Sequence, residues 1–411
     1  MYSSRHSRES GNPAFSRAWT PAFAGVTIPT ERYVRYNAVM DIRELKTPVL
    51  LLDRPKLLAN LARMAARARA LGVSLRPHMK TAKSAAVARL VLEHGASGIA
   101  VSTLAEAGYF LGHGIRDILY AVGLAPAKLD EIAGLAARGA DIKIVTDNVA
   151  AAHAIADHSA PHQILIEVDT GDGRLGLDPA DPELIEVARA AQSTGRSRVL
   201  GVMTHAGQSY DARDPESMAR IAEGERAGAA LAAEKLRAAG FECPIVSVGS
   251  TPTATHARDL SGASEMRPGV YMFGDLFQAG IGSHAAGDIA VSVLASVIGH
   301  RKKDNAVILD AGALALSKDR STEKLAGGDL GFGQLCDLEG RVWPGVTVVG
   351  VSQEHGRVSA KSPLPFDRLP IGGKVRILPN HACITAAGHD VYHVLDGSTE
   401  VVAAWDRCRG W

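Results

Sequence analysis

The stretch "ILIEVDTGDGRLG", residues 164–176, joins a largely apolar run to a polar, glycine-rich segment. The run from Ile164 to Val168 has the length of a β-strand, and it is apolar on both faces, as a strand buried in a parallel sheet requires. Asp169, Asp172 and Arg174 follow it at once. In a barrel of parallel strands the catalytic groups lie at the C-terminal ends, so the stretch predicts both a buried strand and part of a site.

The same alternation of apolar runs and Ala-rich amphipathic segments continues along the chain in both directions. Helices are expected between most of the runs, for example at 104–112 and 217–239. Eight strands in βα alternation are the number in a TIM-type (β/α)8 barrel, which we place at residues 56–285, with a doubly wound open sheet as the alternative. The eight expected strands are 73–75, 98–102, 118–122, 142–146, 164–168, 199–204, 245–248 and 270–273.

The segments before and after this region have a different sequence pattern. Beyond Asp288, strand-like runs alternate with Gly, Pro and charged residues, which predicts a mainly antiparallel β domain over 286–411. The strand expected within 40–55 is predicted to join that domain, because a barrel has no place for a ninth strand. Residues 1–39 lack apolar periodicity, so we expect a disordered or mis-assigned extension, with Met40 as the true start.

Composition excludes several classes of partner. The 411 residues carry a net charge of +1 with acids and bases intermixed, which gives no electrostatic basis for binding nucleic acid. No apolar run approaches the length of a membrane-spanning helix. The four cysteines lie far apart without CxxC spacing, as in a protein of a reducing compartment. We therefore expect a cytoplasmic protein with a small-molecule partner and no nucleic acid or membrane.

Further polar clusters are expected at the ends of other strands, and together they indicate one chemistry. Lys80 follows the first strand; a lysine desolvated by apolar neighbours is suited to form an imine with an aldehyde. Glycine-rich turns at 249–251 and 268–270 offer backbone N–H groups to a phosphate. An aldehyde that carries a phosphate indicates pyridoxal 5′-phosphate, whose ring acts as an electron sink. Taken alone, Lys80 would more often be a solvated surface cation.

The C-terminal stretch "LPNHACITAAGHDVYHVLDG", residues 378–397, holds three histidines and a cysteine. His381 and Cys383 are two positions apart, so on an extended chain both side chains would leave one face and could share a metal ion. The spacing fits a half-buried strand with a buried thiol equally well. From these residues alone, both interpretations remain open.

Several short motifs together resemble one family, the D-amino-acid-processing enzymes with an alanine-racemase-like barrel. This family includes D-serine dehydratase, D-threo-3-hydroxyaspartate dehydratase and D-threonine aldolase, and the resemblance covers about residues 47–397. It is carried by the motifs "RPHMKT", "DTGDGRLG", "HAGQSY", "GSTPT", "EMRPGVYMFGD", "DAGALALSKD", "SQEHG" and "PNHAC".

The resemblance implies roles for particular residues. Lys80 is similar to the lysine that binds the cofactor aldehyde, and Arg174 and Tyr210 are similar to contacts of the cofactor ring. The phosphate-binding positions of the family match Thr251, Gly269 and Val270, the last of which is often Asn in the family. His381 and Cys383 resemble a zinc site, although Mn²⁺ or another divalent ion is an alternative. His389 and His393 are expected to be structural or to support the ligands. The resemblance also implies a homodimer.

The function implied by the resemblance is elimination of water from a D-β-hydroxy amino acid, such as D-serine or D-3-hydroxyaspartate, to give a 2-oxo acid and ammonia. Because Cys383 is a soft ligand that favours zinc, this dehydratase is preferred over the metal-activated D-threonine aldolase, whose branch resembles a site with Asp at that position. A racemase would need a second acid–base group, for which the sequence shows no motif. A non-catalytic pyridoxal-phosphate-binding protein is the alternative from another class.

Overall fold

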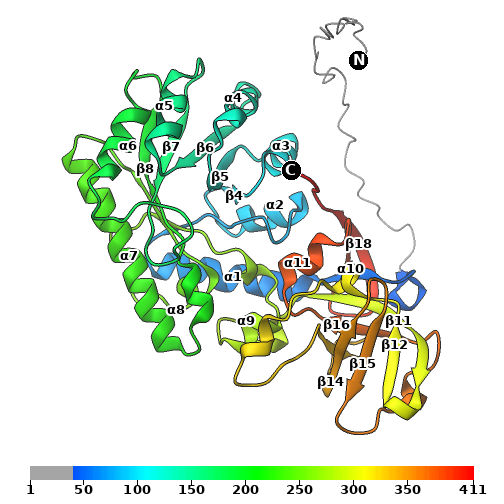
Figure 1. Cartoon of the computed structure of the whole chain (residues 1–411). Coiled ribbons are helices and arrows are strands. Elements are labelled where there is room, and N and C mark those ends of the chain that lie inside the picture. Colours follow the sequence, from blue (N-terminus) through cyan, green and yellow to red (C-terminus); the bar gives the residue numbers. More distant parts are fainter. Residues whose placement is uncertain (1–39) are drawn as a thin grey trace, which may run out of the picture. The chain divides into compact units, whose positions relative to one another are not determined.

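The computed structural model describes residues 40–411, so the expected extension at 1–39 lies outside the described residues. Its first half contains a sheet of eight parallel strands in the order β3-β10-β9-β8-β7-β6-β5-β4 (Figure 1). The strands are β3 (Ser74–Leu75), β4 (Ile99–Val101), β5 (Asp117–Gly123), β6 (Asp141–Thr146), β7 (Gln163–Glu167), β8 (Arg198–Met203), β9 (Ile245–Val248) and β10 (Glu265–Met266).

The strand order distinguishes between the two predicted sheet topologies. From β4 to β10 each strand lies beside its neighbour in the chain, and the first strand, β3, pairs with the last, β10. A doubly wound sheet would instead reverse its order at a switch point, so that alternative is wrong. Between β3 and β4 there is no ladder among the described residues, but His78 and Ala100 form one parallel bridge.

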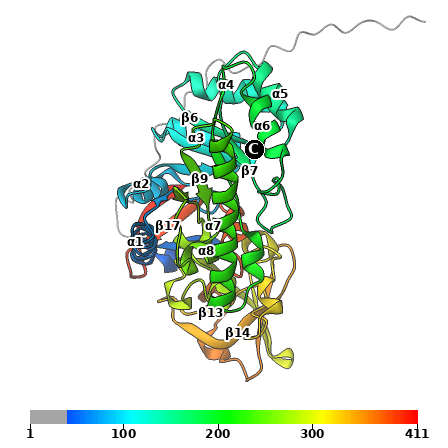
Figure 2. The same ribbon diagram turned by 90° about the vertical axis from the view of Figure 1, so that its left-hand side faces the viewer.

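Helices cover the outer side of this sheet. Apolar side chains of one face, such as Ile118 and Ile144, belong to a large core packed against the helices, whereas Leu119, Val145 and Leu165 form a separate small core on the other face. Figure 2 shows α7 and α8 lying side by side along the sheet. The helices of this half are α1 (Arg54–Ala70), α2 (Ala85–Glu93), α3 (Leu104–Gly112), α4 (Leu129–Ala137), α5 (Val149–Asp157), α6 (Glu183–Ala191), α7 (Pro215–Ala238), α8 (Thr251–His256) and α9 (Leu276–Gly280).

Seven of the eight strands overlap their predicted ranges, and the eighth was placed wrongly. Residues 270–273 are apolar and short enough for a strand, but Val270–Met272 forms a 3-10 helix. The eighth strand is β10, which lies upstream and carries the buried charge of Glu265. A run of four apolar residues is found in buried strands and in buried turns alike, so it does not distinguish the two. Strand β10 was not predicted, because the charged residues in and beside it interrupt the apolar pattern.

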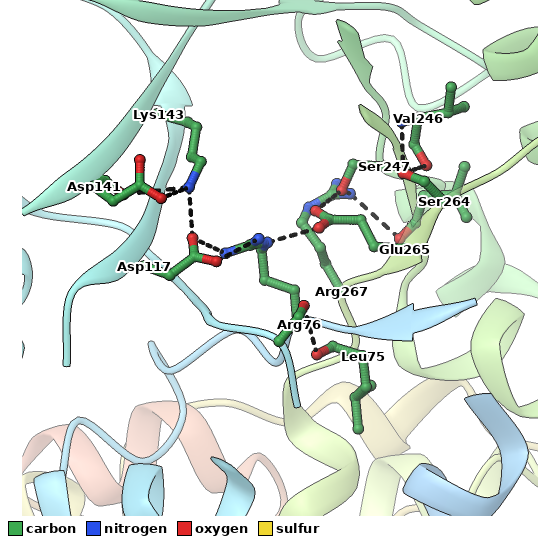
Figure 3. Close-up of polar contacts among 12 residues, drawn as sticks. Leu75, Arg76, Asp117, Asp141, Lys143, Val246, Ser247, Ser264, Glu265 and Arg267 are labelled. Carbon is green, nitrogen blue, oxygen red and sulfur yellow. Dashed lines mark hydrogen bonds and ion pairs between the residues drawn. The ribbon is translucent and has the colours of Figure 1, made fainter. Parts of the chain in front are cut away.

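The charges of β10 belong to a network on the inner face of the sheet (Figure 3). The Arg76 guanidinium donates to Glu265 at 2.8 Å and to Asp117 at 2.7 Å, and Lys143 donates to Asp117 at 2.7 Å. Gly98 leaves the space for this, because a Cβ there would lie 2.4 Å from an Arg76 nitrogen. Arg267 extends the network through the Ser247 hydroxyl, which itself donates to Glu265. Buried charges are tolerated where they are paired in this way.

The second half is built on a closed antiparallel barrel. Six strands follow one another in the order β11-β12-β15-β14-β13-β16, and β16 pairs back with β11. Strand β2 from the start of the chain pairs with β11 and with β17, and β18 and β1 extend that edge. The strands are β1 (Met40–Asp41), β2 (Val49–Asp53), β11 (Val291–Arg301), β12 (Ala306–Leu309), β13 (Gln334–Cys336), β14 (Val342–Val351), β15 (Gly356–Ala360), β16 (Lys374–Leu378), β17 (Val391–Leu395) and β18 (Glu400–Asp406).

Two short helices interrupt this β region, α10 (Ala313–Leu316) and α11 (Ala382–Ala387), which follow β12 and β16. In Figure 1, α11 lies where the parallel and antiparallel halves meet. A single apolar core continues from the parallel sheet into the antiparallel barrel, so that Leu57 and Val348 belong to the same cluster. Among the described residues, no helix is both long enough and apolar enough to cross a membrane.

We predict that Glu265→Ala lowers the free energy of unfolding by about 3–5 kcal/mol, because it leaves the Arg76 cation buried with one partner fewer. The matched control is Glu242→Ala, which removes an exposed partner of Arg198 and should change the free energy by at most about 0.5 kcal/mol. Urea unfolding followed by circular dichroism measures both. A loss below about 1 kcal/mol for Glu265→Ala would show that the network is not needed for stability.

Candidate active site

One cavity of about 690 Å³ is lined by residues of both halves of the chain. From the parallel half, Lys80, His205 and Arg267 face it; from the antiparallel half, His381 and Cys383 do. This volume is in the usual range for small-molecule sites. The cavity lies beyond the C-terminal ends of strands such as β7 and β8, where the sequence placed the site.

Lys80 lies in the turn after β3, and its side chain is exposed into the cavity. This differs from the expectation that apolar strand residues would surround and desolvate it. Its backbone N–H donates to Nδ1 of His78 at 3.3 Å. Burial, reinforced by the charges of Lys80 and Arg267, holds the pKa of His78 well below its usual value, so His78 stays neutral beside the amine.

Residues near the C-terminus hold the backbone that follows Lys80. The carbonyl of Ala82 accepts hydrogen bonds from the Tyr392 hydroxyl at 2.8 Å and from Arg407 Nε at 3.1 Å. The Thr81 hydroxyl lies 3.1 Å from the sulfur of Cys383. The antiparallel half therefore positions the lysine turn, although the lysine itself belongs to the parallel half.

His381 and Cys383 are brought together by the start of a helix and not by a strand. His381 is the N-cap of α11 and Cys383 lies in its first turn, so the extended geometry considered for "HAC" is wrong. Both side chains nevertheless line the same cavity. Nδ1 of His381 also lies 2.7 Å from the Asp319 carboxylate. Sequence reasoning quoted the motif that contains Asp319 but gave this residue no role.

These three side chains form a strongly polarised group. Burial alone would lower the pKa of His381, but the hydrogen bond to Asp319 and the neighbouring sulfur of Cys383 raise it to about 11. Burial alone would raise the pKa of Cys383, but the imidazole of His381, the hydroxyl of Thr81 and the charge of Lys80 lower it. The thiol is thereby favoured as a thiolate, which is the form that binds metal ions.

The other predicted cofactor residues differ in where they lie. Arg174 and Tyr210 line the cavity, and Arg174 Nε lies 3.6 Å from the Asp172 carboxylate. Burial raises the pKa of Tyr210, which stays a neutral hydroxyl. Thr251 is fully buried and is not part of the lining; its hydroxyl accepts the N–H of Tyr271 at 3.2 Å.

Gly269 and Val270 do line the cavity, and within residues 40–411 neither backbone N–H has a hydrogen-bond acceptor. A Cβ on Gly269 would lie 2.9 Å from the carbonyl oxygen of His78, so this wall is packed backbone against backbone. The two N–H groups are therefore available to an oxygen-rich ligand.

Three groups to which the sequence analysis gave no role also face the cavity: Glu167 and Arg267, which are buried, and His205, which is half-buried. Burial, with the charges of Lys80 and Arg267, lowers the pKa of His205 to about 3. Burial raises the pKa of Glu167, and its Oε2 has no hydrogen-bond partner among the described residues. Arg267 connects the cavity to the charged network of Figure 3. Their motifs were visible in sequence, but the direction in which each side chain points was not.

His389 and His393 do not line the cavity. The Nε2 of His389 lies 3.0 Å from the carbonyl oxygen of Ala315, and the carbonyl of His389 accepts a hydrogen bond from Arg407 at 2.7 Å. His389 therefore connects the chain just after α11 to α10, through Ala315, and to Arg407. A structural role for it agrees with these contacts.

Comparison with known families and proteins identifies the chain. Residues 52–276 match the model of the alanine racemase N-terminal domain, and residues 290–395 match a putative serine dehydratase domain. D-threo-3-hydroxyaspartate dehydratase of Delftia sp. (strain HT23) is 47% identical over 377 residues, which cover 89% of this chain and 98% of that protein.

The chain belongs to this family of D-amino acid dehydratases and aldolases, as the motifs predicted. D-serine dehydratase of Dictyostelium discoideum is 31% identical over 90% of this chain and 98% of that protein. D-threonine aldolase of Arthrobacter sp is 31% identical over 87% and 92%. A cysteine-to-alanine mutant of D-threo-3-hydroxyaspartate dehydratase, solved in the metal-free form, superimposes with a TM-score of 0.88 at 45% identity, covering 90% of this chain and 100% of that one.

The family consists of pyridoxal-phosphate-dependent lyases, and the cavity of this member fits that cofactor. It offers an amine at Lys80 for the aldehyde and free N–H groups at Gly269 and Val270 for the phosphate. Cations at Arg174 and Arg267 suit an anionic ligand.

The donor set of His381 and Cys383 in this family member fits a zinc ion, since imidazole and thiolate are its preferred ligands. Within residues 40–411, no group of three or more His, Cys, Asp or Glu side chains is arranged to hold one metal ion. A metal held here would therefore keep open positions for substrate or water. The Asp319 carboxylate on Nδ1 is the partner that metal-binding histidines usually have.

We predict that Lys80→Ala abolishes covalent attachment of pyridoxal phosphate and lowers turnover more than about a hundredfold, because no amine remains to bind the aldehyde or move a proton. Borohydride reduction followed by peptide mass analysis measures the attachment. Lys83→Ala is the matched control, since the Lys83 amine lies 2.9 Å from Glu106 and should leave the attachment unchanged. Attachment to another lysine, or near-normal turnover of Lys80→Ala, would contradict the assignment.

Proposed function

We propose that this protein is a pyridoxal-phosphate- and zinc-dependent dehydratase, which converts a D-β-hydroxy amino acid of the D-3-hydroxyaspartate or D-serine type into a 2-oxo acid and ammonia. The observation that carries the proposal is that His381 and Cys383 share one cavity with Lys80. The 47% identity to D-threo-3-hydroxyaspartate dehydratase supports it. Elimination needs a Lewis acid at the β-hydroxyl, and a two-ligand metal can supply one.

Each residue has a proposed task. Lys80 binds the cofactor aldehyde and, once free, takes the α-proton of the substrate at its Nζ. Arg174 and Tyr210 contact the cofactor ring, and the N–H groups of Gly269 and Val270 bind its phosphate. Thr251, predicted as a direct phosphate contact, is proposed to act through its hydrogen bond to Tyr271, in the turn that carries the two N–H groups.

When bound, pyridoxal phosphate supplies an electron sink that acidifies the α-C–H, and zinc neutralises the charge that develops on the departing β-oxygen. His381 and Cys383 would hold the zinc. His78 and His205 stay neutral, because burial lowers the pKa of both, so neither adds a positive charge to the cavity.

D-threonine aldolase activity is the second candidate, supported by the 31% identity to the Arthrobacter enzyme. In that reaction the metal would lower the pKa of the β-hydroxyl so that the Cα–Cβ bond breaks. The thiolate of Cys383 favours zinc and therefore the dehydratase. A cofactor-carrier role is disfavoured, because a carrier has no use for a metal-binding pair beside the lysine.

Several broader properties are part of the same proposal. The ring order of β3 to β10 and the bridge between His78 and Ala100 support closure of the sheet as a TIM-type (β/α)8 barrel over residues 56–285, followed by the β domain at 286–411. Cytoplasmic location is supported by four free cysteines among the described residues. The homodimer stays a prediction of the family resemblance.

We predict that removal of the metal with a chelator lowers 2-oxo acid formation from D-threo-3-hydroxyaspartate or D-serine by roughly a hundredfold or more, because the leaving oxygen loses its charge stabilisation. Added zinc should restore the rate, while the visible absorbance of the lysine-bound cofactor persists throughout. Cys383→Ala should behave like the chelated enzyme, and Cys336→Ala, a buried thiol outside the cavity, serves as the control.

The products distinguish the candidate functions. Faster release of acetaldehyde and glycine from D-threonine than of any 2-oxo acid would favour the aldolase. An absorbance spectrum that does not change when D-serine or D-threo-3-hydroxyaspartate is added would favour the carrier. If the chelator changes neither reaction, the metal proposal is wrong.

A further inference from the structure

The side chain of Asp319 occupies a defined position beside the proposed metal pair. Its Oδ2 lies 2.7 Å from Nδ1 of His381, and both residues line the cavity. Since a carboxylate can only accept, Nδ1 carries the proton of this bond, which leaves Nε2 as the nitrogen with a lone pair when His381 is neutral.

We propose that Asp319 is the positioning residue of the metal site: its carboxylate fixes the ring orientation and tautomer of His381, so that Nε2 binds the zinc ion next to Cys383. This inference rests on the metal site proposed above and names the group that prepares it. Asp319 lies 62 residues before His381 in the chain. Asp319 comes from the loop after α10, whereas His381 is the N-cap of α11.

The carboxylate is itself held in place. Oδ1 of Asp319 accepts the backbone N–H of Ser321 at 2.7 Å and also the hydroxyl of Ser321. The N–H of Asp319 donates to the hydroxyl of Ser317 at 3.2 Å. Ser317 has a φ of 72°, in the left-handed region, which turns the chain sharply at the end of α10. The acceptor that faces His381 is therefore fixed by its own loop before any metal binds.

Three further hydrogen bonds join the residue before His381 to the segment that follows Asp319. The side chain of Asn380, directly before His381, donates to the Thr322 hydroxyl at 2.7 Å and to the Gly331 carbonyl at 2.8 Å, and its oxygen accepts the Thr322 N–H at 3.3 Å. Asn380 is fully buried. The contact between Asp319 and His381 is thus part of a continuous junction and not an isolated surface pair.

The chemistry of the arrangement explains what Asp319 would contribute. A carboxylate on the remote N–H makes the imidazole a better electron donor and removes its freedom to rotate, and loss of such a partner typically weakens metal binding 10–100-fold. Cys383 needs no equivalent from this loop, because its sulfur is contacted by the Thr81 hydroxyl at 3.1 Å. The two ligands are therefore positioned by different halves of the chain.

The test measures zinc affinity of the pyridoxal-phosphate-loaded protein by competition with a chromogenic chelator. Asp319→Ala should bind zinc about 10–100-fold more weakly than the wild type. Asp319→Asn should lose less, because its amide oxygen can still accept from Nδ1. The matched control is Asp329→Asn, which changes a carboxylate of the same loop that pairs with Arg320 and does not line the cavity. Its zinc affinity should be unchanged.

A second readout separates positioning from general damage to the loop. With Co²⁺ in place of zinc, saturated Asp319→Ala should keep the charge-transfer absorbance of the Cys383 thiolate, while the ligand-field bands that report His381 shift. Melting temperature and cofactor absorbance check that each variant is folded. If Asp319→Ala does not fold, Asp319→Asn carries the test with both readouts.

Zinc affinity of both Asp319 variants within twofold of the wild type would overturn the positioning role. Failure of the metal site itself gives a different pattern, since His381→Ala would then bind zinc as well as the wild type. If His381→Ala loses zinc but Asp319→Ala does not, only the inference about Asp319 is wrong.

Discussion

The backbone from Lys80 to Lys83 is held by residues more than 300 positions away, and the site depends on this constraint. The carbonyl of Ala82 accepts from Tyr392 and Arg407, and the carbonyl of Lys83 accepts the N–H of Cys408 at 2.6 Å. A parallel sheet alone would leave the turn after β3 without these partners. The antiparallel half thus completes the lysine site as well as supplying the proposed metal ligands.

Arg407 shows how one buried group can position both parts of the site. Its guanidinium donates to Ala82 in the lysine turn and to the carbonyls of Ala386 and His389 at the end of α11. Because His381 is the N-cap of α11, Arg407 supports the proposed metal pair from the other end of that helix. The proposed cofactor lysine and metal would act on adjacent carbons of one substrate, which needs such a fixed separation.

The sequence predicted the features that follow from the hydrophobic pattern and from short motifs. It missed those that depend on where a side chain points in the folded chain. Hydrophobic alternation located seven of the eight parallel strands, and short motifs identified the family. The strand expected at 270–273 was wrong, because four apolar residues fit a turn equally well. Thr251 matched a motif but does not line the cavity, and the role of Asp319 could not be inferred because its partner lies 62 residues away. Such contacts are made by tertiary packing, which no local spacing encodes.

We propose that the two halves of the chain build one site, in which a metal lies in the same cavity as the proposed cofactor lysine, Lys80. Anomalous diffraction at the zinc absorption edge, from crystals of the loaded enzyme, tests it most directly. We expect one strong peak in the cavity, about 2.0–2.3 Å from Nε2 of His381 and the sulfur of Cys383. A zinc ion bound elsewhere, with no peak at these two atoms, would contradict it.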